Sequence, residues 1–183
     1  MSDPARLPRM TADEFIAWAM AQPETGHYEP VAGEVVAMAP ERAAHVRAKQ
    51  RIVRRLEEAI ERAGRPCEAF VDGLAVAVDA GTVFEPDALV RCGPKLADDT
   101  LRIDDPVIVV EILSPSPRSV DTGLRFTEYF RLKSLRHYLI VRAETRTVVH
   151  HQRTGDGGIA TRLVQDGRLR LDPPGIDLAG LFG

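Results

Sequence analysis

Two acidic residues stand where a chain rarely places them. Asp87 follows Pro86 at the start of a β-type run, and Glu111 interrupts the most apolar run in the sequence. An unpaired carboxylate in a buried strand is costly, unless it binds a cation or lies at the mouth of a cleft. Neighbouring strands could present both groups in one acidic pocket, where Mg²⁺ or Mn²⁺ would suit the hard oxygen ligands. The alternative is an Asp in a turn and a Glu paired with an arginine.

Three helices are expected around these acids. Thr11 and Glu14 have the spacing of a capping box, which predicts a helix over 11–21. Residues 40–63 predict a long amphipathic helix, because apolar residues recur on one face until a glycine ends the pattern. A third helix is expected over 121–132.

Short β-type runs separated by Gly, Pro and Asp predict the strands. The run 107–113 is nearly all apolar apart from Glu111, which suits a central strand covered on both faces. The other expected strands are 28–31 and 34–38, which form a hairpin, and 75–78, 87–90, 137–141, 147–152, 159–164 and 168–171. Residues 176–182 are expected to form a short turn of helix. Because no repeat or linker is visible, residues 1–183 are expected to form a single domain.

Several short motifs occur along the chain in a fixed order. They are Tyr28-Glu-Pro-Val-Ala-Gly-Glu34, Val71-Asp-Gly-Leu74, Glu85-Pro-Asp87, Glu111-Ile-Leu113-Ser-Pro-Ser and Tyr138-Leu-Ile-Val141. Together they resemble the Uma-two family of putative restriction endonucleases, a bacterial branch of the PD-(D/E)XK nuclease superfamily. The resemblance covers roughly Met10 to Val149. It implies a mixed α/β fold with a restriction-endonuclease-like core, in which helices flank a mixed β-sheet.

The activity that this resemblance implies is that of a metal-dependent endodeoxyribonuclease. Asp87, Glu111 and the main-chain carbonyl of Ile112 would bind Mg²⁺ (or Mn²⁺) for hydrolysis of phosphodiester bonds, with double-stranded DNA as the expected partner. The superfamily places a lysine two residues after the acid, where this chain has Leu113. A family lysine on the following helix aligns with Arg125, which can clamp a phosphate but hardly acts as a general base.

Two alternatives to catalysis stay open. The chain could be a catalytically attenuated nuclease fold that binds nucleic acid or a protein. It could also be a structural domain whose acids are simply ion-paired.

Other residues are weaker candidates. His45 matches a family histidine and is expected to assist at the metal or the phosphate, the alternative being a plain surface histidine. Glu34 also matches a family position, although a Gly-Glu turn is common in hairpins. Asp121 is expected to cap the following helix rather than bind metal, and Tyr129 to belong to the core. The His150-His151 pair is not expected to bind one metal, because successive strand residues point to opposite faces.

The formal net charge is −3, so any nucleic-acid binding must rest on a local basic patch. One candidate lies on the long helix, where a run of cations forms either a solvated face or a ridge that tracks phosphates. Its members are Arg47, Lys49, Arg51, Arg54 and Arg55.

The cysteines and the apolar stretches of the sequence predict the cellular location. Cys67 and Cys92 fit no zinc spacing, so two reduced, half-buried thiols are expected. No apolar stretch has the character of a signal peptide or a membrane span, which predicts a soluble, cytoplasmic protein with no membrane partner. Exposed sheet edges and the modest size favour a homodimer.

Overall fold

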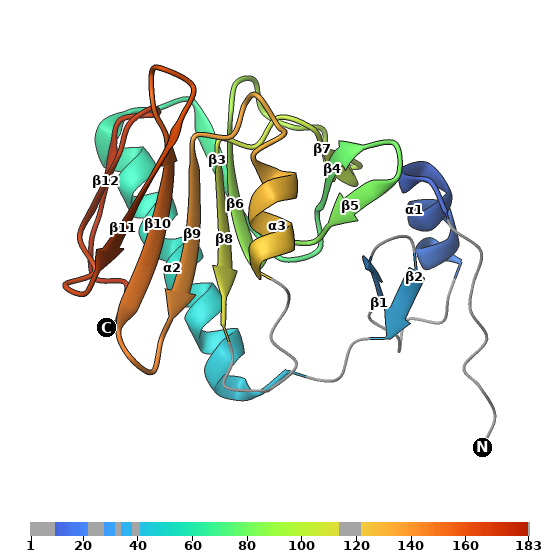
Figure 1. The fold of residues 1–183 in the computed structure, drawn as a ribbon, viewed down its shortest axis with the longest axis horizontal. Coiled ribbons are helices and arrows are strands. Elements are labelled where there is room, and N and C mark those ends of the chain that lie inside the picture. Colours follow the sequence, from blue (N-terminus) through green and yellow to red (C-terminus); the bar gives the residue numbers. More distant parts are fainter. Residues whose placement is uncertain (1–9, 22–27, 32–33, 38–40, 114–121, 183) are drawn as a thin grey trace.

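A six-stranded mixed sheet forms the centre of the molecule, in the strand order β11-β10-β9-β8-β6-β3 (Figure 1). The computed structural model describes residues 10–21, 28–31, 34–37, 41–113 and 122–182. The strands of this sheet are β3 (Cys67–Val71), β6 (Ala88–Cys92), β8 (Ile108–Ile112), β9 (His137–Arg142), β10 (Thr147–Arg153) and β11 (Ile159–Val164). Neighbouring strands are antiparallel except β8 and β9, which are parallel.

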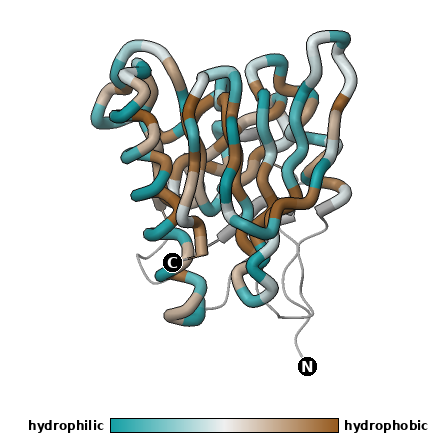
Figure 2. Tube along the Cα trace, turned by 90° about the vertical axis from the view of Figure 1, so that its left-hand side faces the viewer, coloured by the Kyte–Doolittle hydropathy of each residue, from teal (hydrophilic) through white to brown (hydrophobic). Residues whose placement is uncertain are grey.

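Helices cover both faces of this sheet. The long helix α2 (Ala43–Ala63) lies on one face, and the short helix α3 (Thr122–Tyr129) lies on the other (Figure 1). Alternate residues of the strands serve the two faces, so Val110 packs in the α2 core and Val109 in the α3 core. Every residue of β8 is buried, which confirms the prediction of a central strand covered on both sides. Figure 2 shows hydrophobic segments along the strands and hydrophilic positions in many of the connecting loops.

Smaller sheets complete the core. β4 (Ala75–Asp79), β5 (Thr82–Phe84) and β7 (Arg102–Ile103) form a three-stranded sheet that contributes Val76, Phe84 and Ile103 to the α3 side. β12 (Leu169–Leu171) and β13 (Ile176–Leu178) form a two-stranded sheet whose buried leucines and isoleucine pack in the α2 core. The expected turn of helix at 176–182 was therefore wrong over its first residues. The sequence Ile-Asp-Leu alternates buried, exposed and buried, which is the period of a strand.

The N-terminal elements agree with the sequence pattern. α1 (Ala12–Met20) begins with the predicted capping box, in which the Glu14 amide donates to Thr11 Oγ1 at 3.3 Å and the Thr11 amide donates to Glu14 Oε2 at 2.8 Å. β1 (Tyr28–Val31) and β2 (Glu34–Ala37) pair as the predicted hairpin. The expected helix starts at Pro40 and Asp121 lie outside the described residues. Among the described helices, none has the length and apolar character needed to cross a bilayer.

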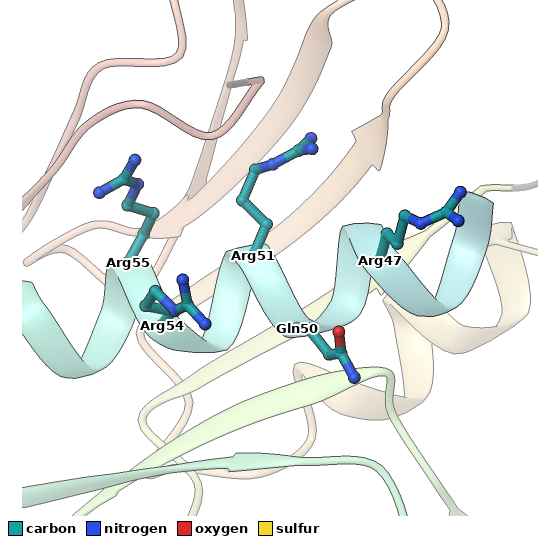
Figure 3. Close-up of a pocket in the computed structure, with 5 residues that line it drawn as sticks. All are labelled: Arg47, Gln50, Arg51, Arg54 and Arg55. Atoms are coloured by element: carbon teal, nitrogen blue, oxygen red, sulfur yellow. The ribbon is translucent and has the colours of Figure 1, made fainter. Parts of the chain in front are cut away.

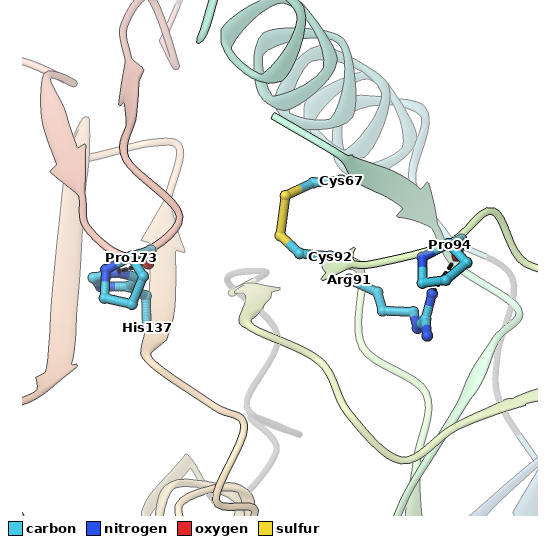
Figure 4. Close-up of a disulfide and its surroundings, with 6 residues drawn as sticks. All are labelled: Cys67, Arg91, Cys92, Pro94, His137 and Pro173. Carbon is cyan, nitrogen blue, oxygen red and sulfur yellow. Dashed lines mark hydrogen bonds between the residues drawn. A yellow bond between two sulfur atoms is a disulfide. The ribbon is translucent and has the colours of Figure 1, made fainter. Parts of the chain in front are cut away.

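A disulfide bond joins Cys67 and Cys92, and no described cysteine is free. The two residues lie directly opposite one another in the antiparallel pair β3–β6, with their Cα atoms 3.9 Å apart (Figure 4). The expectation of two reduced thiols was wrong, because it overlooked β3, whose pairing with β6 brings the cysteines together. Disulfides persist chiefly in oxidising compartments, so the cytoplasmic location stays a prediction.

Two buried histidines connect the central sheet to the turn before β13. Arg162 Nε donates to His150 Nδ1 at 3.0 Å, so the proton of the neutral His150 ring is on Nε2. That nitrogen donates to His137 Nδ1 at 2.9 Å, and His137 Nε2 in turn donates to the carbonyl of Pro173 at 2.8 Å (Figure 4). Both rings are fully buried. Each ring therefore has one donor and one acceptor already in use.

Candidate active site

Asp87 lies immediately before β6, at the end of the central sheet, where the sequence predicted it. Its Oδ2 accepts the amide proton of Ile112 at 2.6 Å, and its Oδ1 lies 3.2 Å from both His45 Nε2 and Lys49 Nζ. Burial by itself would raise the pKa of Asp87, but the bonds from His45 and Ile112 and the charge of Lys49 lower it overall. Asp87 is therefore an ionised carboxylate held between the end of β8 and the α2 helix.

Lys49 was expected among the cations of the outer run of α2, as part of either a solvated face or a ridge that tracks phosphates, and this placement was wrong. Its side chain is 4% exposed and its ammonium lies 2.5 Å from Glu41 Oε1 and 2.8 Å from Asp72 Oδ2. Lys49 falls on the buried face of α2, one turn after His45, so both side chains reach the end of β6. Burial opposes the charge of Lys49, but bonds from Asp72 and Glu41 raise its pKa overall.

Glu111 lies in β8 and faces α3 rather than α2. Its Oε1 accepts from Arg125 Nη1 at 2.6 Å and from the Tyr129 hydroxyl at 3.1 Å. All three side chains are buried, and the Arg125 guanidinium also lies 5.2 Å from the centre of the Phe84 ring. Burial, followed by the charge of Glu111, raises the pKa of Tyr129 well above its ordinary value. Glu111 is thus the carboxylate of a buried ion pair, and Tyr129, expected in the core, is both buried and bonded to it.

The two acids are neighbours with different partners. Ala88, the residue after Asp87, pairs with Val110, the residue before Glu111, so the two acids lie near one another at the same end of β6 and β8. Asp87 takes its cations from α2, whereas Glu111 takes its cation from α3. Nearby, the hydroxyl of Tyr138 is buried and has no hydrogen-bond partner among the described residues. Burial and the charge of Glu111 raise the pKa of Tyr138.

A cation could be held at this end of the sheet. The ligand atoms of Glu41, His45 and Asp87 lie within 4.8 Å of one another. The two carboxylates suit Mn²⁺ or Mg²⁺, whereas an imidazole is a ligand that softer divalent metals prefer. The pKa of His45 is raised, chiefly by its bond to Asp87, so metal binding would require the ring to be neutral. Glu111 is not a member of this group of three.

The predicted ligand Ile112 and the weaker candidates Glu34 and Asp121 stand as follows. The amide of Ile112 is used by Asp87, and metal binding by its carbonyl stays a prediction. Glu34 lies in β2, but its side chain is not among those that the structure describes. Asp121 lies outside the described residues.

The outer face of α2 carries arginines. Arg47, Gln50, Arg51, Arg54 and Arg55 line a depression on this face. Figure 3 shows the guanidinium groups of Arg47, Arg51 and Arg55 along one side of the helix. Arg55 pairs with Glu58 at 2.8 Å, whereas the described part of the chain offers no ion-pair partner to Arg47, Arg51 or Arg54. We call Arg47, Arg51 and Arg54 the arginine ridge.

Comparison with known proteins identifies the family of the chain. Residues 12–179 match the family described as "Uma2: Putative restriction endonuclease". The chain belongs to the Uma2 family. The uncharacterized proteins slr1290 and sll1609 of Synechocystis sp. are each 27% identical to this Uma2 chain. The first match covers 97% of the chain and 93% of slr1290, and the second covers 80% of the chain and 82% of sll1609.

A solved structure resembles this Uma2 chain in fold. It is that of a putative nuclease belonging to DUF820 from Anabaena variabilis, with a TM-score of 0.63, 19% identity and coverage of 86% of each chain. The predicted family and the predicted fold, a mixed sheet flanked by helices, are both confirmed.

Sequence reasoning about this Uma2 chain missed three residues of the site: Glu41, Lys49 and Asp72. The signal for Lys49 was present, because it lies three residues before Ile52 and seven before Leu56, on the apolar face of an amphipathic helix. A lysine at a buried helix position needs a carboxylate partner. Asp72 could not be found in this way, because its role depends on the turn between β3 and β4.

Proposed function

We propose that this chain is a metal-dependent endodeoxyribonuclease that hydrolyses phosphodiester bonds in double-stranded DNA. The observation that carries the proposal is Asp87, an ionised carboxylate at the end of the central sheet whose ligand atom lies within 4.8 Å of those of Glu41 and His45. Membership of a family described as putative restriction endonucleases supports the same chemistry.

In this proposal the residues have distinct tasks. Asp87, His45 and Glu41 hold Mg²⁺ (or Mn²⁺), which when bound supplies Lewis-acid chemistry at the phosphate. Arg125 exchanges Glu111 for a phosphate oxygen of the substrate, because a guanidinium binds either anion through the same donors. Glu111, once released from Arg125, would be a further metal ligand, together with the main-chain carbonyl of Ile112. The buried pair of Arg125 with Glu111 is the resting arrangement.

The test is cleavage of supercoiled plasmid by the purified chain with Mg²⁺, Mn²⁺ or EDTA. Cleavage should need metal, and Asp87→Asn should lower its rate at least about 100-fold, because the ion loses its central ligand. The matched control is Asp98→Asn, since the Asp98 side chain is 99% exposed and makes no contact with the site. Metal-independent cleavage, or equal activity in Asp87→Asn and Asp98→Asn, would reject the proposal.

A second candidate function is a catalytically attenuated module that binds nucleic acid. The observation that favours it is that both acids already have buried cations as partners: Arg125 for Glu111 and Lys49 for Asp87. For this module, duplex DNA binding persists and plasmid cleavage is absent with every metal.

The arginine ridge is the proposed contact for the DNA backbone. Replacing Arg47, Arg51 and Arg54 together by alanine should weaken duplex binding, because three phosphate contacts are lost. The slope of log affinity against log salt concentration should become shallower by up to about 2.7, or 0.9 for each contact. Fluorescence anisotropy with a labelled duplex measures both quantities.

A control triple variant separates the ridge from net charge. Lys133, Arg142 and Arg168 are exposed, and their replacement by alanine removes the same charge elsewhere on the surface. Equal losses of affinity in the two triple variants would show that the ridge has no special role.

We also propose that residues 1–183 act as one domain and that two copies associate. The edge strand β11 supports association, because it is largely exposed and presents Leu163 at 70% exposure.

A further inference from the structure

The ammonium of Lys49 lies among three carboxylates. Its distances are 2.5 Å to Glu41 Oε1, 2.8 Å to Asp72 Oδ2 and 3.2 Å to Asp87 Oδ1. The Lys49 side chain is 4% exposed, whereas the side chains of Glu41 and Asp72 are 40% and 51% exposed, so solvent reaches the carboxylates but hardly the ammonium. Lys49 is therefore a buried lysine with three acidic partners, unlike the solvated cations of α2.

The oxygens that hold Lys49 are the same atoms that face the imidazole of the candidate metal group. Glu41 Oε1 is 3.7 Å from His45 Nε2, and Asp87 Oδ1 is 3.2 Å from the same nitrogen. A divalent ion bound by His45 together with the carboxylate oxygens nearest to it would therefore use the two oxygens that the ammonium already contacts. Two cations cannot share these oxygens without strong repulsion.

We propose that Lys49 is the resident cation of this site, and that a divalent metal binds there only when the Lys49 ammonium withdraws. The inference rests on the proposed metal site, and it adds a residue that controls metal affinity. Lys49 neutralises part of the charge of Glu41 and Asp87 in the metal-free protein and weakens metal binding by competition.

Asp72 supplies a place for the displaced ammonium. It binds Lys49 but does not belong to the group of three possible metal ligands. Its position is fixed by the turn between β3 and β4, where Asp72 and Gly73 have φ values of 42° and 78°, and where the Asp72 amide donates to the Asp87 carbonyl at 3.2 Å. Lys49 can therefore leave Glu41 and Asp87 without losing its last carboxylate partner.

Mn²⁺ binding to the full chain tests the proposal. Electron paramagnetic resonance counts free Mn²⁺ in titrations of the wild type, Lys49→Met and the control Lys95→Met, whose side chain is 79% exposed. Lys49→Met is expected to bind Mn²⁺ at least about tenfold more tightly than the wild type, because the competing charge is gone, while Lys95→Met binds like the wild type. Unchanged or weaker binding by a folded Lys49→Met overturns the proposal. It is also overturned if neither the wild type nor Lys49→Met binds Mn²⁺.

A second measurement uses the wild type, so it does not depend on the folding of the variant. Carbon-13 spectra of the lysine ε-carbons are recorded during a Mg²⁺ titration. A saturable shift of the Lys49 signal is expected, and a Lys49 signal that stays unchanged throughout the titration overturns the proposal.

The inference and the nuclease proposal can fail separately. Tighter Mn²⁺ binding by Lys49→Met without plasmid cleavage by any form of the chain keeps the resident cation and rejects the nuclease. Metal-dependent cleavage with no change of Mn²⁺ affinity in Lys49→Met keeps the nuclease and rejects the resident cation.

Discussion

Replacing Glu111 by alanine is expected to lower the free energy of unfolding by about 3–5 kcal/mol, because it removes a carboxylate partner of the buried Arg125 guanidinium. The Arg125 guanidinium is 5% exposed and donates to Glu111 at 2.6 Å. Without the carboxylate, Arg125 and the hydroxyl of Tyr129 lose an acceptor inside the core. Urea unfolding followed by circular dichroism measures the loss.

A double variant separates the stranded charge from the lost contacts. Glu111→Ala with Arg125→Met removes both charges and keeps an apolar side chain of similar length on α3, so much of the stability should return. A loss below about 1 kcal/mol in the single variant would mean that water reaches Arg125 and satisfies it. The same variant must be shown to be folded before it is used in activity assays. Only then does absence of cleavage in Glu111→Ala indicate loss of a metal ligand.

Lowering the pH from 7.5 to 5 is expected to destabilise the fold by about 2 kcal/mol for each of His137 and His150. Burial is the main cause of the low pKa of both rings, which falls to about 4 for His137 and about 3 for His150. The folded protein therefore binds fewer protons than the unfolded chain below the ordinary histidine pKa of about 6.5. The stability is complete above that pH and is lost as the pH falls toward 4 and 3.

The structural reason is that neither ring can accept a proton without breaking a hydrogen bond. His150 Nδ1 already accepts from Arg162, and His137 Nδ1 already accepts from His150. Urea unfolding at several pH values measures the slope of stability against pH. Replacing His137 and His150 together by leucine should flatten that slope between pH 7.5 and 5. His151→Gln, on the half-buried opposite face, should flatten it less, although burial lowers the pKa of His151 as well.

Other groups contribute less in this pH range or oppose the trend. His45 acts in the opposite direction, because its pKa is raised in the fold and its stabilisation is lost as the pH rises. Aspartate carboxylates titrate mainly below pH 5. A slope that is the same in the wild type and in the double leucine variant would show that the buried pair does not control acid stability.

The sequence predicted the fold well where one local pattern decides the structure. The amphipathic α2, the capping box of α1 and the apolar strand β8 each follow from a period in the residues, and each is confirmed. The short strands β3, β5 and β7 were missed, because strands of this kind depend on their pairing partners more than on their own residues. The disulfide was not predicted either, because it depends on the pairing of β3 with β6.

The site was predicted in part for a similar reason. The positions of Asp87 and Glu111 at the strands follow from local sequence, and the pairing of Ala88 with Val110 brings the two acids to the same end of the sheet. Their partners come from elements far away along the chain. Whether Glu111 meets Arg125, and whether Asp87 meets Lys49, depends on which face of the sheet each helix covers, and no spacing in the sequence states this.

The pairing of β3 with β6 has a consequence for how the edge of the sheet opens. An edge strand normally frays from its ends, since few contacts hold it there. One end of this ladder is closed covalently by Cys67 and Cys92, and the other is closed by Asp72, whose amide and carboxylate bind Asp87 and Lys49. Withdrawal of Lys49 would loosen the second closure alone. The strand would then remain attached at its far end, so the carboxylates could rearrange around an incoming ion without the sheet coming apart.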